Sequence, residues 1–125
     1  MHVGKGIRTG QPSGLRSATN TGAVWSDILL NSAGARTISI MFPPGARTYW
    51  HTHEGGQFIY TVAGEGWIQE RGGGLVTLNP GDVVWTEPGV EHWHGASKSG
   101  LVTQIALHFG EVNWLKEVTD QEYGK

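Results

Sequence analysis

The stretch that decides the fold runs over residues 45–64 and reads GARTYWHTHEGGQFIYTVAG. It is rich in β-branched and aromatic residues, which favour strands. Because side chains alternate between the two faces of a strand, His51 and His53 point the same way. Gln57 is also an even number of residues away, and it joins them if Gly55 and Gly56 only bend the strand. We therefore predict two imidazoles and one amide on a single face.

A second histidine-bearing stretch covers residues 81–94, GDVVWTEPGVEHWH. The turn signal at Pro88 and Gly89 brings the chain round to His92 and His94. We predict that four side chains from the two stretches meet around one metal ion inside a small barrel: His51, His53, Gln57 and His92. Imidazole nitrogen and amide oxygen suit Mn, Fe, Ni, Co or Zn.

The composition indicates one globular domain of 125 residues. Hydrophobic residues at 38% and charged residues at 16% allow a core, and 20 dispersed glycines indicate many tight turns. The net charge of −2, without a Lys/Arg cluster, argues against nucleic acid as a partner. The absence of cysteine excludes disulfides and thiolate ligands, and no apolar run is long enough to cross a membrane. We expect a cytoplasmic protein with a small-molecule substrate.

About nine short runs with strand character are separated by Gly/Pro turns, which indicates an all-β sandwich or barrel. The clearest runs are 23–30, 37–42, 47–53, 57–62, 67–70, 75–78, 83–86 and 101–109. Residues 1–22 are expected to be an N-terminal arm or edge strand, and residues 23–125 a single domain. The tail has helical spacing at Val112, Leu115 and Val118, and Thr119 with Glu122 resembles a capping box. We therefore expect a short C-terminal helical segment.

These two stretches resemble the two conserved motifs of the cupin superfamily. The first motif is matched by Gly45, His51, His53, Gln57 and Gly64, and the second by Gly81, Pro88, Gly89 and His92. Glu87 and Ala96 depart from the second motif, but neither is a ligand position. The resemblance implies a cupin-type jelly-roll β-barrel.

Gln57 stands where most cupins carry Glu. The His, His, Gln, His set resembles the small manganese-dependent hydroxynitrile lyases of cupin fold, as do PGARTYWHTH, GDVVW, HWHGA and VNWLKEVTDQEY. This similarity covers roughly residues 20–123, and it implies Mn as the metal and cyanohydrin cleavage or synthesis as the reaction. An uncharged set of ligands leaves the ion its full +2 charge, which favours Lewis-acid chemistry over oxygen activation.

Such a lyase also needs a base. His94 lies two residues after His92, and His108 lies on one face of the last long strand, so both are candidate catalytic residues. The second histidine, or Gln104, would stabilise the leaving cyanide. An apolar substrate pocket is expected to be lined by Ile38, Ile40, Ile59 and Thr61. A second reading takes His94 as a structural residue that holds the loop of His92.

Two other functions fit the same residues. One is a metal-dependent cupin dioxygenase, and the other is a non-catalytic cupin that binds a metal or a small ligand. Cupins of this size usually associate through the sheet face that points away from the cavity. Here that face is predicted to carry Phe58, Tyr60 and Val62, so we expect a homodimer, with a tetramer as the alternative.

Overall fold

The computed structural model describes residues 1–6 and 12–124, and all regular secondary structure in this part of the chain is β. The first sheet has six strands in the order β1-β3-β4-β12-β7-β10. Their bounds are Gly14–Arg16 for β1, Val24–Ser32 for β3, Ala35–Phe42 for β4, Val102–Phe109 for β12, Gln57–Gly64 for β7 and Val83–Thr86 for β10. All of these pairings are antiparallel.

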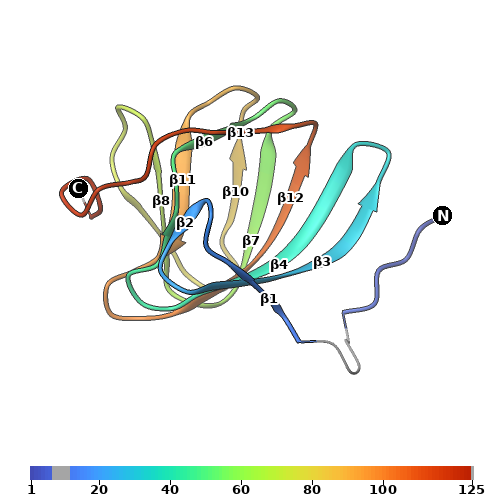
Figure 1. Cartoon of the computed structure of the whole chain (residues 1–125), viewed down its shortest axis with the longest axis horizontal. Helices are drawn as coiled ribbons and strands as arrows, with labels where there is room; N and C mark the ends of the chain where they lie inside the picture. The colour runs from blue at the N-terminus through green and yellow to red at the C-terminus, as the bar shows by residue number, and fades with distance from the viewer. Residues whose placement is uncertain (7–11, 125) are drawn as a thin grey trace.

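The second sheet has seven strands, with β13-β6-β11-β5-β2 in order and β8 and β9 joined to it through β11. Their bounds are Val112–Trp114 for β13, His51–His53 for β6, His92–Ala96 for β11, Arg47–Thr48 for β5, Asn20–Thr21 for β2, Gly66–Glu70 for β8 and Val76–Leu78 for β9. Figure 1 shows the two sheets curving toward each other. The arrangement is the predicted jelly-roll β-barrel.

The main hydrophobic core lies between the sheets. In β4 the side chains of Ile38, Ile40 and Phe42 are buried, whereas the alternate residues are partly exposed, as the alternation in TISIMF predicts. They pack with buried residues from both sheets and from the segment before β5: Val24, Ala46, Ile59, Ile68, Leu78, Ala96, Val102 and Ala106. The inward face of β4 therefore belongs to the core of the barrel.

The C-terminal helical segment is not formed in the described residues, so that prediction is wrong. Val112–Trp114 is strand β13 instead, and a single hydrogen-bonded turn follows in which the N–H groups of Glu122 and Tyr123 donate to Thr119 O at 3.0 and 2.9 Å. In an α-helix the Glu122 N–H would donate to Val118 O. That carbonyl instead accepts hydrogen bonds from the Arg47 guanidinium, the shorter at 2.7 Å.

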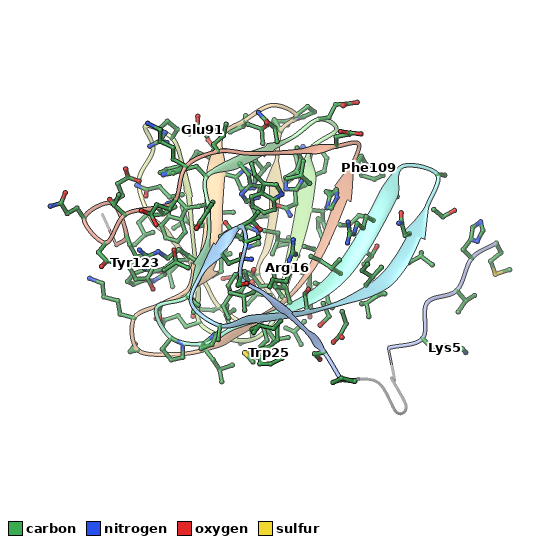
Figure 2. All side chains as sticks on the ribbon, in the orientation of Figure 1. Lys5, Arg16, Trp25, Glu91, Phe109 and Tyr123 are labelled. Carbon is green, nitrogen blue, oxygen red and sulfur yellow. The ribbon has the colours of Figure 1, made fainter. Side chains whose placement is uncertain are left out.

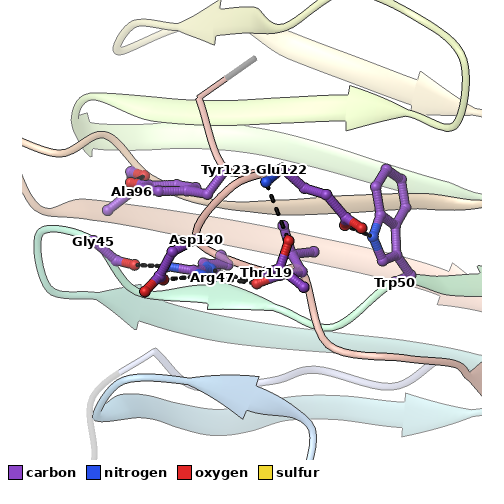
Figure 3. Close-up of polar contacts among 9 residues, drawn as sticks. Gly45, Arg47, Trp50, Ala96, Thr119, Asp120, Glu122 and Tyr123 are labelled. Atoms are coloured by element: carbon purple, nitrogen blue, oxygen red, sulfur yellow. Dashed lines mark hydrogen bonds and ion pairs between the residues drawn. The ribbon is translucent and has the colours of Figure 1, made fainter.

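This tail covers a second, smaller core on the outer face of the second sheet. Trp50, Trp93, Val118 and Tyr123 are buried there. Figure 3 shows how Arg47, Trp50 and Tyr123 bind the tail to the sheet, with Trp50 Nε1–H donating to Glu122 at 2.7 Å. The tail therefore packs as an extended strap, not as a helix.

The N-terminal region contributes two short strands, β1 against β3 and β2 against β5. On the outer face of the first sheet, β7 and β10 expose four large apolar side chains: Tyr60, Val62, Val83 and Trp85. Phe58 on the same face is half-buried. Across residues 1–6 and 12–124, no helix is long and apolar enough to span a membrane.

Candidate metal centre

The predicted metal ligands come from both sheets. His51 and His53 lie on β6, and His92 lies on the neighbouring β11, directly opposite His51. Gln57 begins β7 in the other sheet, because the chain crosses between sheets at Gly56, where φ is +86° and an added Cβ would lie 2.6 Å from the Trp85 ring. The segment is therefore two strands and not one bent strand, yet all four side chains are buried and face inward.

The three imidazoles converge closely. One ring nitrogen each from His51, His53 and His92 lies within 4.8 Å of the others, and the ring centroids are separated by 4.3 to 5.5 Å. Metal–nitrogen bonds are about 2.1 Å long, so ligands on opposite sides of one ion lie about 4 Å apart. These three residues could hold a metal ion.

Hydrogen bonds fix which nitrogen two of these rings present. Nδ1–H of His51 donates to Tyr49 O at 2.8 Å, and Nδ1–H of His92 donates to Val90 O at 3.0 Å. The lone pair of each ring is then on Nε2, which points inward. Backbone carbonyls that orient ligating histidines in this way are a common feature of metal sites.

Two further features of the cluster fit a bound cation. Both ring nitrogens of His53 are buried and have no hydrogen-bond partner among the described residues. Gln57 Oε1 lies 2.9 Å from Nε2 of His92, so two acceptors face each other. Acceptors at that distance repel unless a cation lies beside both. A half-turn of the amide would place its N–H against His92 instead, and the oxygen-inward orientation is the one that binds a metal.

The electrostatic surroundings keep the rings neutral, which is the form that binds metals. Burial, and then the neighbouring His92, lowers the pKa of His53 to about 3. Burial followed by the charges of His92 and His94 places the pKa of His51 well below its usual value, and burial also lowers the pKa of His92. The lone pairs are therefore available at neutral pH.

The two candidate bases lie beside this cluster. His94 Nδ1–H donates to Gln104 Oε1 at 2.9 Å, so its Nε2 carries the lone pair, and burial lowers its pKa to about 3. His108 pairs across the sheet with Gln57, and its ring lies 4.7 Å from that of His53. Burial lowers the pKa of His108 as well.

A cavity of about 530 Å³ opens onto the cluster. Among the predicted site residues it is lined by His51, His53, Gln57, His94, His108, Ile38 and Ile40. Three other residues predicted for the pocket, Ile59, Thr61 and Gln104, are fully buried and do not line it. His92 is also fully buried and does not line the cavity.

Comparison with known proteins identifies the family. Residues 39–105, more than half of the chain, match the family model described as Cupin domain. The chain belongs to the cupin family. It is 43% identical over 110 residues to the (R)-mandelonitrile lyase of Granulicella tundricola, and the match covers 82% of this chain and 84% of that protein.

Solved cupin structures agree with the fold. A cupin-like protein from Thermotoga maritima has a TM-score of 0.86 and 35% identity, covering 94% of this chain and all of that one. A predicted oxalate decarboxylase from the same organism has a TM-score of 0.68 and 25% identity, covering 82% of this chain and 92% of that one.

The cupin barrel also brings residues to the cavity that the sequence analysis missed: Arg16, Asn31, Arg36, Thr48, Glu111, Val112 and Trp114. Trp114 lies directly opposite His51, with ring centroids 4.6 Å apart, but its segment was taken for a helix. Arg36 continues the alternation of Ile38 and Ile40, and this signal was available in the sequence. Arg16 lies in the polar N-terminal region, where no motif marks it.

Proposed function

We propose that this cupin is a metal-dependent lyase that cleaves and forms cyanohydrins, with a divalent ion held by His51, His53, Gln57 and His92. The observation that carries the proposal is the convergence of three neutral imidazoles and a carboxamide oxygen at a cavity large enough for a guest molecule. The similarity to a protein named (R)-mandelonitrile lyase supports this reaction in particular. We propose Mn²⁺ as the ion.

The donor set fits such an ion. All four ligands are uncharged, and two of them are already oriented by backbone carbonyls. A divalent ion bound there would supply Lewis acidity toward an oxygen of the guest. Four protein ligands also leave coordination positions for that guest if the ion is six-coordinate.

His94 is placed to take the proton, although burial makes it a weak base with a pKa of about 3, so a bound divalent ion would have to supply the Lewis acidity that acidifies the hydroxyl. Its Nδ1–H is held by Gln104, so Nε2 is free to accept the hydroxyl proton of a cyanohydrin. The carbon–carbon bond to the nitrile then breaks, with its electron pair going to the cyanide carbon and the carbonyl forming at the former alcohol. The proton passes from His94 to cyanide, which gives one aldehyde and one HCN.

The remaining cavity residues position the guest. His108 lies on the opposite sheet from His94, where its ring would stabilise the departing cyanide by hydrogen bonding. Ile38 and Ile40 give the cavity wall an apolar surface that suits the hydrocarbon part of an aldehyde. The division of labour between the histidines follows from the Gln104 contact, which only His94 makes among the described residues.

The test is release of benzaldehyde from mandelonitrile by the Mn-loaded protein, compared with protein stripped by a chelator. We expect turnover only with metal. The matched variant is Gln57→Glu, which keeps the shape of the ligand but adds a negative charge, so it should bind Mn²⁺ more tightly and turn over more slowly. No benzaldehyde above the stripped control, or oxygen uptake by an Fe-loaded sample, would contradict the proposal.

We further propose that the chain forms a homodimer through the outer face of β7 and β10. The apolar side chains exposed there, Tyr60, Val62, Val83 and Trp85, support it. Light scattering should give twice the 13.5 kDa mass of the chain. Trp85→Glu should give the monomer mass, and a monomeric native protein would contradict the proposal.

A further inference from the structure

Two arginines line the same cavity as the histidine cluster. Arg36 lies on β4 directly opposite His108, so the two side chains share the inward face of the sheet. Arg16 lies on β1 opposite the buried Val24, and it too lines the cavity. Figure 2 marks Arg16 on β1, at the front of the molecule in that view. Both residues therefore line the side of the cavity that is formed by β1 and β4.

Neither arginine has a counterion among the described residues. Within residues 1–6 and 12–124, the ion pairs of arginine are Arg47 with Asp120 and Arg71 with Glu91, and no hydrogen bond from the side chain of Arg16 or Arg36 is found. Arg16 is half-buried, and its pKa is lowered by burial and then by the charge of Arg36. Arg36 is exposed, so the burial cost falls on Arg16, and an anion between the two guanidinium groups would offset both that cost and their mutual repulsion.

The rest of the cavity lining does not supply that anion. Glu111 is the single carboxylate among the lining residues described, and it forms no ion pair with either arginine. With the histidines neutral, the lining has a net charge of +1. This charge, which a divalent ion bound at the histidine cluster would raise to +3, favours an anionic guest, and a carboxylate is an anion that two guanidinium groups can hold through paired N–H donors.

From this geometry we propose that Arg16 and Arg36 form a carboxylate-binding subsite, so that the guest of this cavity is a small organic acid whose reacting group lies toward the histidine cluster. Guanidinium groups bind carboxylates through paired N–H donors, which gives both affinity and orientation. The inference deepens the proposed function, on which it rests only in taking this cavity as the substrate site. It adds that the preferred carbonyl product carries a carboxylate.

The experiment compares two aldehydes of the same shape, 4-formylbenzoate and 4-formylbenzamide, which differ in charge. Binding of each to the full-length protein is measured by titration calorimetry, with Mn²⁺ and without metal. We expect the acid to bind at least about tenfold more tightly than the amide in both states, because a charge-assisted hydrogen bond contributes about 1.5 kcal/mol or more.

Four variants locate the effect. Arg16→Gln and Arg36→Gln should each reduce the acid-to-amide preference about tenfold, while Arg36→Lys should keep part of it. Arg71→Gln is the matched control, because Arg71 lies outside the cavity lining and is paired with Glu91, and it should keep the full preference. Circular dichroism checks that each variant is folded.

The outcomes separate this subsite from the lyase assignment. Charge preference that depends on Arg16 and Arg36 supports the subsite even if no benzaldehyde is released from mandelonitrile. Equal affinity for the two aldehydes, failure of the acid to bind, or an equal loss in Arg71→Gln would overturn the subsite, even if cyanohydrin cleavage is observed.

Discussion

The two faces of the second sheet differ in how their buried polar groups are satisfied. On the outer face, under the C-terminal strap, Arg47, Trp50 and Tyr123 each donate to a partner at 2.5 to 2.7 Å. On the cavity face of the same sheet, both nitrogens of His53 lack a partner among the described residues. One strand such as β11 serves both faces, with Trp93 packed outward and His92 and His94 inward.

This contrast separates stability from function. Buried polar groups that are fully hydrogen-bonded fix a unique packing, whereas unpartnered ones cost stability and mark sites that bind something. The strap is therefore expected to carry the stability of this sheet, and the cavity face its chemistry. Substitutions on the outer face should lower the free energy of unfolding, whereas substitutions on the cavity face should weaken metal binding.

The largest effect on the outer face is expected from Arg47→Met. It leaves the buried Val118 carbonyl without its two guanidinium hydrogen bonds and frees the strap, so the free energy of unfolding should fall by about 3 kcal/mol. Urea denaturation measures this. Asp120→Asn is the control, because Asp120 is 95% exposed and its ion pair should contribute less than about 1 kcal/mol. Equal losses in the two variants would contradict the account.

On the cavity face, His53→Ala should weaken metal binding at least about a hundredfold, because loss of even an outer partner of a ligand costs up to that factor. The ring makes no hydrogen bond to another described residue, so the stability of the metal-free protein should change little. Metal titration and urea denaturation of the same sample measure both. Unaltered metal affinity, or a large loss of stability without metal, would reverse the assignment of the two faces.

The pH dependence of stability should also come from the cavity face. His94, with a folded pKa of about 3, stays neutral where the unfolded chain binds a proton below about 6.5. The unfolded state therefore binds more protons between pH 6.5 and 3, and the stability of the metal-free protein should fall as pH decreases through this window. Each such histidine contributes about 1.4 kcal/mol per pH unit well below 6.5.

Urea denaturation of metal-free protein at pH 7, 6 and 5 measures this slope above the range where carboxylates titrate. His94→Gln should make the slope shallower by one proton. A stability that is flat from pH 7 to 5 would show that the cavity histidines are not held neutral.

The smallest effect is expected from Tyr123→Phe, which removes one buried hydrogen bond to Ala96 O and keeps the ring that packs on Trp67 and Trp93. The free energy of unfolding should fall by about 1 kcal/mol, with metal affinity unchanged. A larger change in metal affinity than in stability would mean that the strap acts on the cavity directly.

The sequence predicted most of the residues on the cavity face of the second sheet, but it did not predict how the tail packs on the outer face. The even spacing of His51 and His53 and the second histidine stretch predicted which side chains meet, because a strand alternates its faces whatever surrounds it. The prediction of a C-terminal helix was wrong because helical spacing in the tail is a local signal. The Arg47 guanidinium, 71 residues away in the chain, occupies the carbonyl that a helix would need.

The cavity arginines show the same limit. Arg36 could be placed from the alternation of β4, but nothing local indicates that Arg16 reaches the same cavity, because that depends on the pairing of β1 with β3. Whether Arg16 and Arg36 have counterions depends on which strands lie beside them, and a local sequence pattern does not contain that information. Residues that act through long-range pairing are the ones that sequence patterns leave out.

The most direct test of the central claim is anomalous diffraction from crystals of the Mn²⁺-loaded protein, recorded at the manganese absorption edge. The account predicts one anomalous peak within bonding distance of Nε2 of His51, a ring nitrogen of His53, Nε2 of His92 and Oε1 of Gln57, at the inner end of the cavity. A peak at any other place, or none in this cluster, would contradict it.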